Sequence, residues 1–373
     1  MPVFRTCFIL FWGVILCCVP ARAQDPLRLA VIAAMTGDAA VSSRIMFDAA
    51  RYAADEINAS GGLLGRHVEI LEYDNQSSAI GSRLAAKAAV SAKADAVIGA
   101  SWSAHSLAMA PVFEAAEIPM ISPMSTNPGV TRDRRYVFRV CFTDEYQGKA
   151  LAKFAYDDLG ARRVVVLCNV DRAYSVGLAD AFSEAFAALG GQIPWRGEFL
   201  LDVADYSALL RKTAQSHPDL IFLPGDYRDS SFIIGQARKM GLGETFLGGD
   251  SFGGRLYEYI GKLAEGSYYS THWSRDNPSP RSQAFVKQYE AQHEFIKQTT
   301  IPMTYDAVML WADAVRRAGS ADGKAVRDAL AATRDFHGVT GTISYQGTGD
   351  PRRPVIINRL ENGGVAFIKE IVP

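Results

Sequence analysis

The pattern of apolar and polar positions alternates between two periods along the first part of the chain. Short apolar runs typical of buried strands occur at 27–33 and 96–99, and 68–74 is expected to be the strand between them. Stretches with apolar residues at helical spacing occupy 45–57 and 80–92. Strand and helix therefore alternate, which predicts a doubly wound α/β lobe with parallel strands and right-handed crossovers.

The same alternation restarts after Asp144 and predicts a second α/β lobe of similar size. Strands are expected at 164–167 and 220–223, with a helix at 178–189 between them. The segment 136–142 is expected to be a strand that leads away from the first lobe. Two such lobes joined by strand crossings imply a cleft between them.

Beyond residue 271 the pattern becomes mainly helical. Helices are expected at 283–297, 306–318 and 324–332, and short strands at 338–345, 355–358 and 365–371. No segment after the N-terminal 23 residues is long and apolar enough to span a membrane, so we expect a protein that is not embedded in one.

Two hydroxyl-rich turns follow neighbouring strands of the first lobe. Ser103 and Ser106 open a helix after the strand at 96–99, and Ser125 and Thr126 follow the next strand. The carboxyl ends of parallel strands face one crevice, and a helix N-terminus favours an anion. The sequence therefore predicts a carboxylate site here. The alternative is that Ser103 only N-caps its helix and that Asn127 begins an ordinary turn.

Second-lobe residues that follow strands could complete such a site. Asp250 could pair with a ligand ammonium group, since a desolvated charge needs a partner; the alternative is an N-cap for the next helix. Tyr174 and Tyr227 either cover an apolar ligand or pack in an ordinary way. Trp102, beside Ser103, either lines the cleft wall or packs under its helix.

Composition and motifs exclude several classes of function. The 373-residue chain is 49% hydrophobic and nearly neutral, with a formal net charge of −1, so it lacks the basic footprint of a nucleic-acid-binding protein. Its six histidines show no helical metal-ligand spacing, and no phosphate-binding loop or dinucleotide motif occurs. We therefore expect no cofactor. A hydrolase with Ser103 as nucleophile is disfavoured, because Ser101 and His105 replace the glycines of a nucleophile elbow.

The N-terminal residues 1–23 have the form of a secretory signal peptide. Arg5 precedes an apolar run at 7–19, and small residues lead to a cleavage site after Ala23. The mature protein is expected to be exported to an oxidising compartment. Only Cys141 and Cys168 remain after cleavage, and we expect two buried thiols, with a disulfide between them as the alternative.

The chain resembles a known family, the type I periplasmic binding proteins of ABC importers, and in particular the binders of branched-chain amino acids. The resemblance covers essentially the whole mature chain. It is carried by AMTG at 34–37, DEINASGG at 55–62, YDN at 73–75, VIG at 97–99, ISP at 121–123, TNP at 126–128 and FLGGD at 246–250.

The resemblance implies two lobes joined by three hinge crossings, near 141–144, 271–274 and 338–342. The first lobe would comprise residues 24–142 with 273–340, and the second residues 143–272 with 341–373. Such proteins close on a ligand like a hinged clamp.

The resemblance also implies roles for individual residues. Ser103, Ser106, Ser125 and Thr126 match the positions that hold a ligand carboxylate, and Asp250 matches the acid that holds the ammonium. Tyr174 and Tyr227 match the aromatics that close over the ligand. Asp250 is shorter than the Glu often found there, Ser42 replaces a frequent aromatic, and the cysteines that some members carry near Ser77 and Trp102 are missing.

The function expected from the sequence is therefore capture, not catalysis. We expect a small amino acid, branched-chain or otherwise aliphatic, to be bound and delivered to the permease of an ABC transporter. The alternatives are a binder of an amide, urea or an aromatic acid, or a module that senses a ligand for a receptor.

Overall fold

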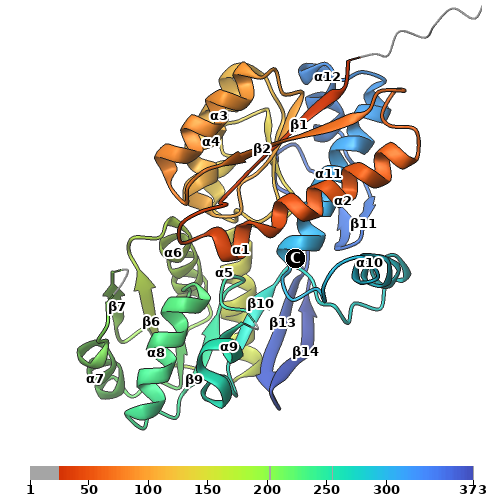
Figure 1. Ribbon diagram of the computed structural model, residues 1–373. Coiled ribbons are helices and arrows are strands. Elements are labelled where there is room, and N and C mark those ends of the chain that lie inside the picture. The colour runs from red at the N-terminus through yellow and green to blue at the C-terminus, as the bar shows by residue number, and fades with distance from the viewer. Residues whose placement is uncertain (1–24, 201–202, 254, 373) are drawn as a thin grey trace, which may run out of the picture.

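The computed structural model describes residues 25–200, 203–253 and 255–372. They form two α/β lobes, each with helices on both faces of a sheet (Figure 1). The expected signal peptide, residues 1–23, lies outside the described residues.

The first lobe contains a five-stranded parallel sheet in the order β2-β1-β3-β4-β5. Its strands are β1 (Leu27–Ala33), β2 (Val68–Asp74), β3 (Ala96–Gly99), β4 (Met120–Ser122) and β5 (Val137–Arg139). The expected strand at 136–142 is shorter than predicted: β5 pairs in parallel with β4 and completes this sheet, and the chain leaves the lobe only after Arg139.

Helices cover both faces of this sheet, because successive side chains of β1 point to opposite faces and are buried on both (Figure 1). Leu29 and Val31 face the core beneath α2 (Ile45–Ala59) and α11 (Thr300–Ala318). Ala30 and Ile32 face the core beneath α3 (Ala79–Ser91) and α4 (Ser103–Ala116). β1 and β3 are buried on both faces, which explains why they read as nearly continuous apolar runs.

The second lobe contains a seven-stranded mixed sheet in the order β14-β13-β10-β9-β8-β6-β7. The parallel strands are β6 (Val164–Asn169), β7 (Arg196–Phe199), β8 (Leu220–Phe222), β9 (Thr245–Gly248) and β10 (Tyr268–Thr271). The antiparallel strands β13 (Val355–Glu361) and β14 (Gly364–Ile371) extend one edge.

The helices of the second lobe also divide between two cores. On one face lie α5 (Asp144–Lys153), its continuation as a π-helix (Phe154–Asp158), and α6 (Ala173–Ala188). On the other lie α7 (Ser207–Gln215), α8 (Tyr227–Lys239) and α9 (Leu256–Ile260), followed by a 3₁₀ turn at Gly261–Ala264. Gly148 lets α5 approach α6 closely, since a Cβ there would lie 2.7 Å from the Ala181 Cβ.

The remaining elements are short helices and a hairpin. They are α1 (Ala40–Ser43), a 3₁₀ turn at Pro128–Val130, α10 (Pro280–Glu290), α12 (Gly323–Ala331), β11 (Phe336–Gly338) and β12 (Gly341–Ile343). The expected helix at 283–297 is wrong beyond Glu290, and α11 begins six residues before the expected start at 306.

The chain passes between the two sheets three times. The first two passages, at 140–143 and 272–279, overlap the expected crossings. The expected crossing at 338–342 is wrong, as is the single strand at 338–345, because this segment is the β11–β12 hairpin. Ile343 and Tyr345 still belong to the first-lobe core, so the chain reaches the second sheet between 346 and 355.

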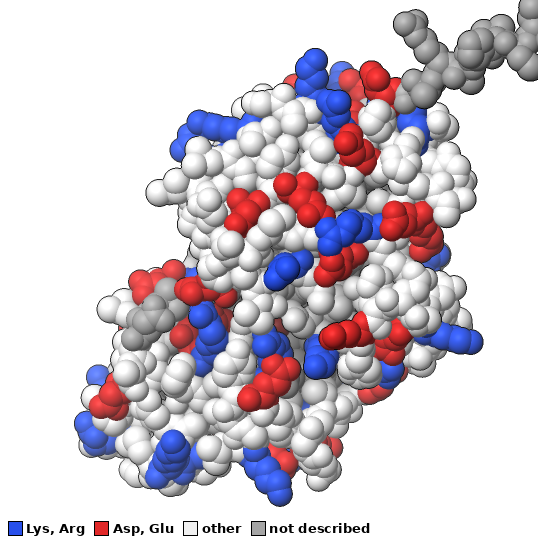
Figure 2. Space-filling model, viewed as in Figure 1, with Lys and Arg blue, Asp and Glu red and all other residues white. Residues whose placement is uncertain are grey.

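Cys141 and Cys168 are both free and buried, as expected. They belong to the cores of different lobes, and burial raises the pKa of the Cys141 thiol to about 12. On the face shown in Figure 2, acidic and basic side chains are interspersed over both lobes, as the nearly neutral composition predicts.

Candidate functional site

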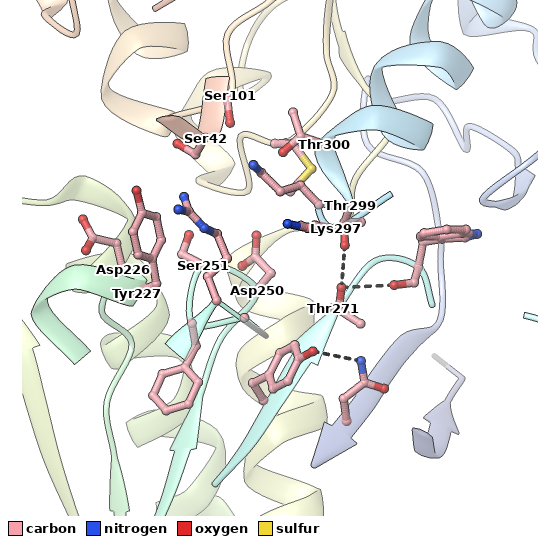
Figure 3. Close-up of a pocket in the computed structure, with 18 of the residues that line it drawn as sticks. Ser42, Ser101, Asp226, Tyr227, Asp250, Ser251, Thr271, Lys297, Thr299 and Thr300 are labelled. Atoms are coloured by element: carbon pink, nitrogen blue, oxygen red, sulfur yellow. Dashed lines mark hydrogen bonds between the residues drawn. The ribbon is translucent and has the colours of Figure 1, made fainter. Parts of the chain in front are cut away.

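A cavity of about 550 Å³ lies between the lobes and is lined from both sides. Figure 3 shows Ser42 and Ser101 facing Asp226, Tyr227 and Ser251 across the space. The loops after the carboxyl ends of β3, β4, β6, β8 and β9 all contribute to it, which is where open parallel sheets bind ligands.

Ser103 belongs to the first-lobe wall of this cavity and is 3% exposed. It is the first residue of α4, whose N-cap is Trp102, so the N-cap alternative for Ser103 is wrong. Its Oγ instead accepts a hydrogen bond from the Asn127 N–H at 3.2 Å and joins the two hydroxyl-rich turns. The Asn127 side chain accepts a hydrogen bond from the Gly129 N–H, so the turn expected there is present.

Ser106 and Ser125 lie directly behind this wall and are not among the residues that line the cavity. Their hydroxyls are 2.7 Å apart, and the Ser106 Oγ accepts the Ala100 N–H at 2.9 Å. The Ser125 Oγ also reaches the Ala100 carbonyl at 3.0 Å. Both side chains are completely buried, so their hydrogen bonds brace the loop after β3.

Thr126 is 1% exposed and is also not among the residues that line the cavity. Its carbonyl accepts a hydrogen bond from the Asp144 N–H at 2.8 Å. Its hydroxyl makes no hydrogen bond of normal geometry among the described residues, but it lies close enough to the Asp144 carboxyl to lower the pKa of that group. The Thr126 hydroxyl therefore lies next to Asp144.

Asp250 lines the second-lobe wall, and its side chain is only 4% exposed. Its carboxylate accepts hydrogen bonds from Gln147 Nε2 at 2.8 Å and His272 Nε2 at 3.1 Å. Burial raises the pKa of Asp250, but these bonds outweigh burial and hold it below its usual value. The N-cap alternative is wrong, because α9 starts at Leu256 with Arg255 as its N-cap. The cavity wall therefore carries a fixed negative charge.

The three aromatic candidates all line the cavity. Tyr174, at the start of α6, accepts a hydrogen bond from the Ser251 N–H at 3.4 Å through its hydroxyl. Tyr227 is the first residue of α8, and the Arg255 guanidinium lies 4.6 Å from its ring centroid. Trp102 stacks on His105, with centroids 5.5 Å apart, and carries the Arg172 guanidinium on its ring at 4.1 Å.

Asp144 is a buried acid that sequence reasoning did not single out. It opens α5 and is completely buried, and no hydrogen bond of normal geometry reaches its carboxylate oxygens among the described residues, although the Thr126 side chain lies close enough to lower its pKa. Burial raises its pKa to about 8, and the nearby negative charge of Asp250 adds to this effect. Asp144 is therefore mainly protonated at neutral pH, so the two neighbouring acids are held in different charge states.

Sequence reasoning also missed several polar residues of the cavity wall. Arg172 and Arg255 come from the second lobe. Lys297 and Thr299 come from the segment between α10 and α11 (Figure 3). Arg172 could have been found, because it follows β6 in the same way that Asp250 follows β9. Lys297 was missed because it was placed at the end of the expected helix 283–297, whereas it lies between α10 and α11.

No group of His, Cys, Asp and Glu able to hold a metal ion occurs in the part of the chain that the structure describes. Among the same residues, no helix is long and apolar enough to cross a membrane.

A two-lobed architecture with a lined cleft at the strand ends invites comparison with known proteins. A family model described as a periplasmic binding protein matches residues 26–364, which is most of the chain. The chain belongs to the periplasmic binding protein family. This is a family of solute-binding proteins, so the catalytic alternative has no support from it.

Relatives of this periplasmic binding protein share the fold over nearly their full lengths. The leucine-specific-binding protein of Salmonella typhimurium is 28% identical over 329 residues, covering 87% of this chain and 88% of that protein. A crystal structure of a leucine-binding protein from Thermotoga maritima is 37% identical, with a TM-score of 0.89, covering 93% of this chain and 99% of the other.

A Streptococcus pneumoniae branched-chain amino acid transporter substrate-binding protein, solved with isoleucine, is 29% identical, with a TM-score of 0.87. It covers 93% of this chain and 100% of its own. The type I periplasmic binding protein fold is therefore established for this chain.

Proposed function

We propose that this protein captures a small α-amino acid in the interlobe cleft, branched-chain or otherwise aliphatic, and delivers it to the permease of an ABC transporter. The observation that carries the proposal is the Asp250 carboxylate, held ionised in the wall of a cavity whose opposite wall contains Ser103. An α-amino acid presents an ammonium group and a carboxylate one carbon apart, and these two walls complement the two charges.

In this proposal each wall has a separate electrostatic task. The ligand ammonium pairs with Asp250, since a desolvated cation needs a partner. The carboxylate bonds to the Ser103 hydroxyl and to the N–H groups of the first turn of α4, where the helix dipole favours an anion. Thr126, whose hydroxyl lies next to Asp144, stands behind this wall, and Ser106 and Ser125 fix the shape of the loop.

The aliphatic side chain of the ligand would contact Tyr174, Tyr227 and Trp102. Closure of the lobes removes water from the cleft, which strengthens both charged interactions. The names of the relatives support an aliphatic ligand, because they are leucine-, isoleucine- and valine-binding proteins.

Delivery to a permease requires export, and residues 1–23 supply the expected signal peptide. The mature chain would then act in the periplasm, bound to its permease only during transfer. This part of the proposal is tested by fractionating cells that express the full-length chain and determining the N-terminus of the periplasmic form.

The ligand is tested by a thermal-shift screen of the mature protein after unfolding and refolding, which removes co-purified ligand. The panel comprises the amino acids, their amides, urea and benzoate. A ligand that binds only the folded state raises the melting temperature. Shifts with leucine, isoleucine or valine that vanish with their amides are expected. Shifts confined to amides, urea or benzoate would overturn the proposal.

A further inference from the structure

Arg172 lines the cleft, and the proposed function does not use it. It lies three residues after β6 and directly before α6, in the second lobe. It lines the cavity, and its side chain is 19% exposed. It therefore presents a cation to the same space as Ser103 and Asp250.

The hydrogen-bond donors on one edge of this guanidinium are unused. Nε and Nη2 are both buried, and neither has a hydrogen-bond partner among the described residues. These two nitrogens form one side of the planar group, and their parallel N–H bonds match the two oxygens of a carboxylate. Buried charged donors without an acceptor are costly, so this edge is suited to an acceptor that arrives from outside the protein.

Asp226, the acid that forms an ion pair with Arg172, does not fill this position. Asp226 Oδ2 lies 3.8 Å from Nη2 of Arg172, beyond hydrogen-bond distance. The other oxygen of Asp226 accepts hydrogen bonds from the N–H groups of Arg228 and Asp229, at 2.9 and 3.2 Å. Asp226 is thus held as the N-cap of α8 and balances the charge of Arg172 without occupying its donors.

The Arg172 guanidinium packs against the Trp102 ring. The Arg172 Cζ lies 4.1 Å from the Trp102 ring centroid, and Trp102 in turn stacks on the buried His105. Burial is the main reason that the pKa of His105 falls to about 4, so the ring beneath Trp102 is neutral at physiological pH. A guanidinium whose orientation is set before binding loses little entropy when a ligand arrives.

We propose that Arg172 is a ligand-binding residue that holds a carboxylate of the bound molecule side-on, next to the wall formed by Trp102 and Ser103. The proposal rests on the proposed function only in that a ligand enters this cleft. Two carboxylates could supply the group: the α-carboxylate of any amino acid, or the side-chain carboxylate of an acidic one.

The test is isothermal titration calorimetry with the refolded wild-type protein, Arg172→Gln and Arg228→Gln. Arg228 is the matched control, because it also reaches across the cleft, to Asp38 at 3.5 Å, and is not among the residues that line the cavity. The ligands are leucine, leucinamide, 4-methylpentanoate, glutamate and glutamine, together with the tightest ligand from the thermal-shift screen and its amide.

Arg172→Gln is expected to weaken binding of carboxylate ligands by roughly 10- to 100-fold, which is typical of a lost charge-assisted hydrogen-bonded pair. Binding of amides should change little, and Arg228→Gln should leave the difference between acid and amide unchanged. Equal losses for leucine and glutamate identify the α-carboxylate, whereas a loss confined to glutamate identifies a side-chain carboxylate.

Two results would overturn the role of Arg172. One is unchanged affinity for carboxylate ligands in Arg172→Gln, and the other is a wild-type protein that binds only ligands without a carboxylate. A different result would overturn only the proposed function. If 4-methylpentanoate binds as tightly as leucine, and Arg172→Gln weakens its binding, then the ligand is a simple acid and the role of Arg172 is retained.

Discussion

The Asp250 carboxylate and the His272 imidazole meet at the base of the cleft, with Nε2 of His272 3.1 Å from Oδ2 of Asp250. Both side chains are almost completely buried. Burial lowers the pKa of His272, so the ring is neutral at pH 7 and donates Nε2–H to a carboxylate that keeps its charge. The negative charge that a ligand meets is thus fixed in place before the ligand arrives.

Replacing Asp250 by Asn should weaken amino-acid binding by ~2–5 kcal/mol, because the ligand ammonium loses a desolvated charged partner. Binding of 4-methylpentanoate, which has no ammonium group, should not weaken. Titration calorimetry measures both. Asp276→Asn is the matched control, since Asp276 is an exposed acid of the same cavity with no proposed role. Equal affinities for leucine in Asp250→Asn and wild type would remove Asp250 from the site.

Ser103 and Ser106 should separate binding from stability. Ser106→Ala leaves the buried Ala100 N–H without its acceptor and should lower the free energy of unfolding by about 1–3 kcal/mol. Ser103→Ala should mainly weaken ligand binding, by about 1 kcal/mol. Urea denaturation of the ligand-free variants and calorimetry with ligand measure the two effects. The reverse ranking, with Ser106 controlling affinity, would restore Ser106 as a direct ligand residue.

Asp144 should make the stability of the ligand-free protein depend on pH. Its pKa is about 8 in the folded protein, against 3.8 for an ordinary Asp. Between these values the folded state keeps a proton that the unfolded state has lost, so stability falls as pH rises, by up to about 1.4 kcal/mol per pH unit. Above pH 8 the loss is complete, and below about pH 4 it disappears.

Asp144→Asn removes this titration while it preserves the size of the side chain. The melting temperature of the variant should therefore exceed that of the wild type by an amount that grows from pH 4.5 to pH 8. Differential scanning calorimetry of both proteins across this range provides the comparison. A difference that stays constant with pH would show that Asp144 is ionised in the folded protein.

Cys141 and Cys168 should be inert in the folded protein. Both are buried, and the raised pKa of Cys141 keeps its thiol protonated. Iodoacetamide should label neither cysteine under native conditions and both in guanidinium chloride, and a reducing agent should leave the melting temperature unchanged. Mass spectrometry of the labelled protein counts the reacted thiols. A mass that shows no labelling after denaturation without reductant would indicate a disulfide.

Strand and helix order could be predicted because the central strands of each sheet are buried on both faces. Val164, Val165 and Val166 are all fully buried, so this strand is a continuous apolar run that can be recognised from the sequence alone. The β11–β12 hairpin was not predictable in this way. Its three-residue strands are too short to show a period, and its position depends on packing against α11.

The cleft residues that follow strands could be identified from local sequence, because the carboxyl ends of parallel strands lie at the same edge of a sheet. It could not distinguish Ser103, which lines the cavity, from Ser106, which turns inward three residues later on the same helix. It also could not show that Asp250 and His272 pair, since these residues come from different segments that only the folded lobe brings together.

The proposed amino-acid binding requires that one cleft recognises an ammonium group and a carboxylate at the same time. The measurement is calorimetric titration of the refolded wild-type protein with leucine, leucinamide and 4-methylpentanoate under identical conditions. We predict that leucine binds, and that removing either charged group weakens binding by at least ~2 kcal/mol. Affinities for leucinamide or 4-methylpentanoate that equal or exceed the affinity for leucine would contradict the account.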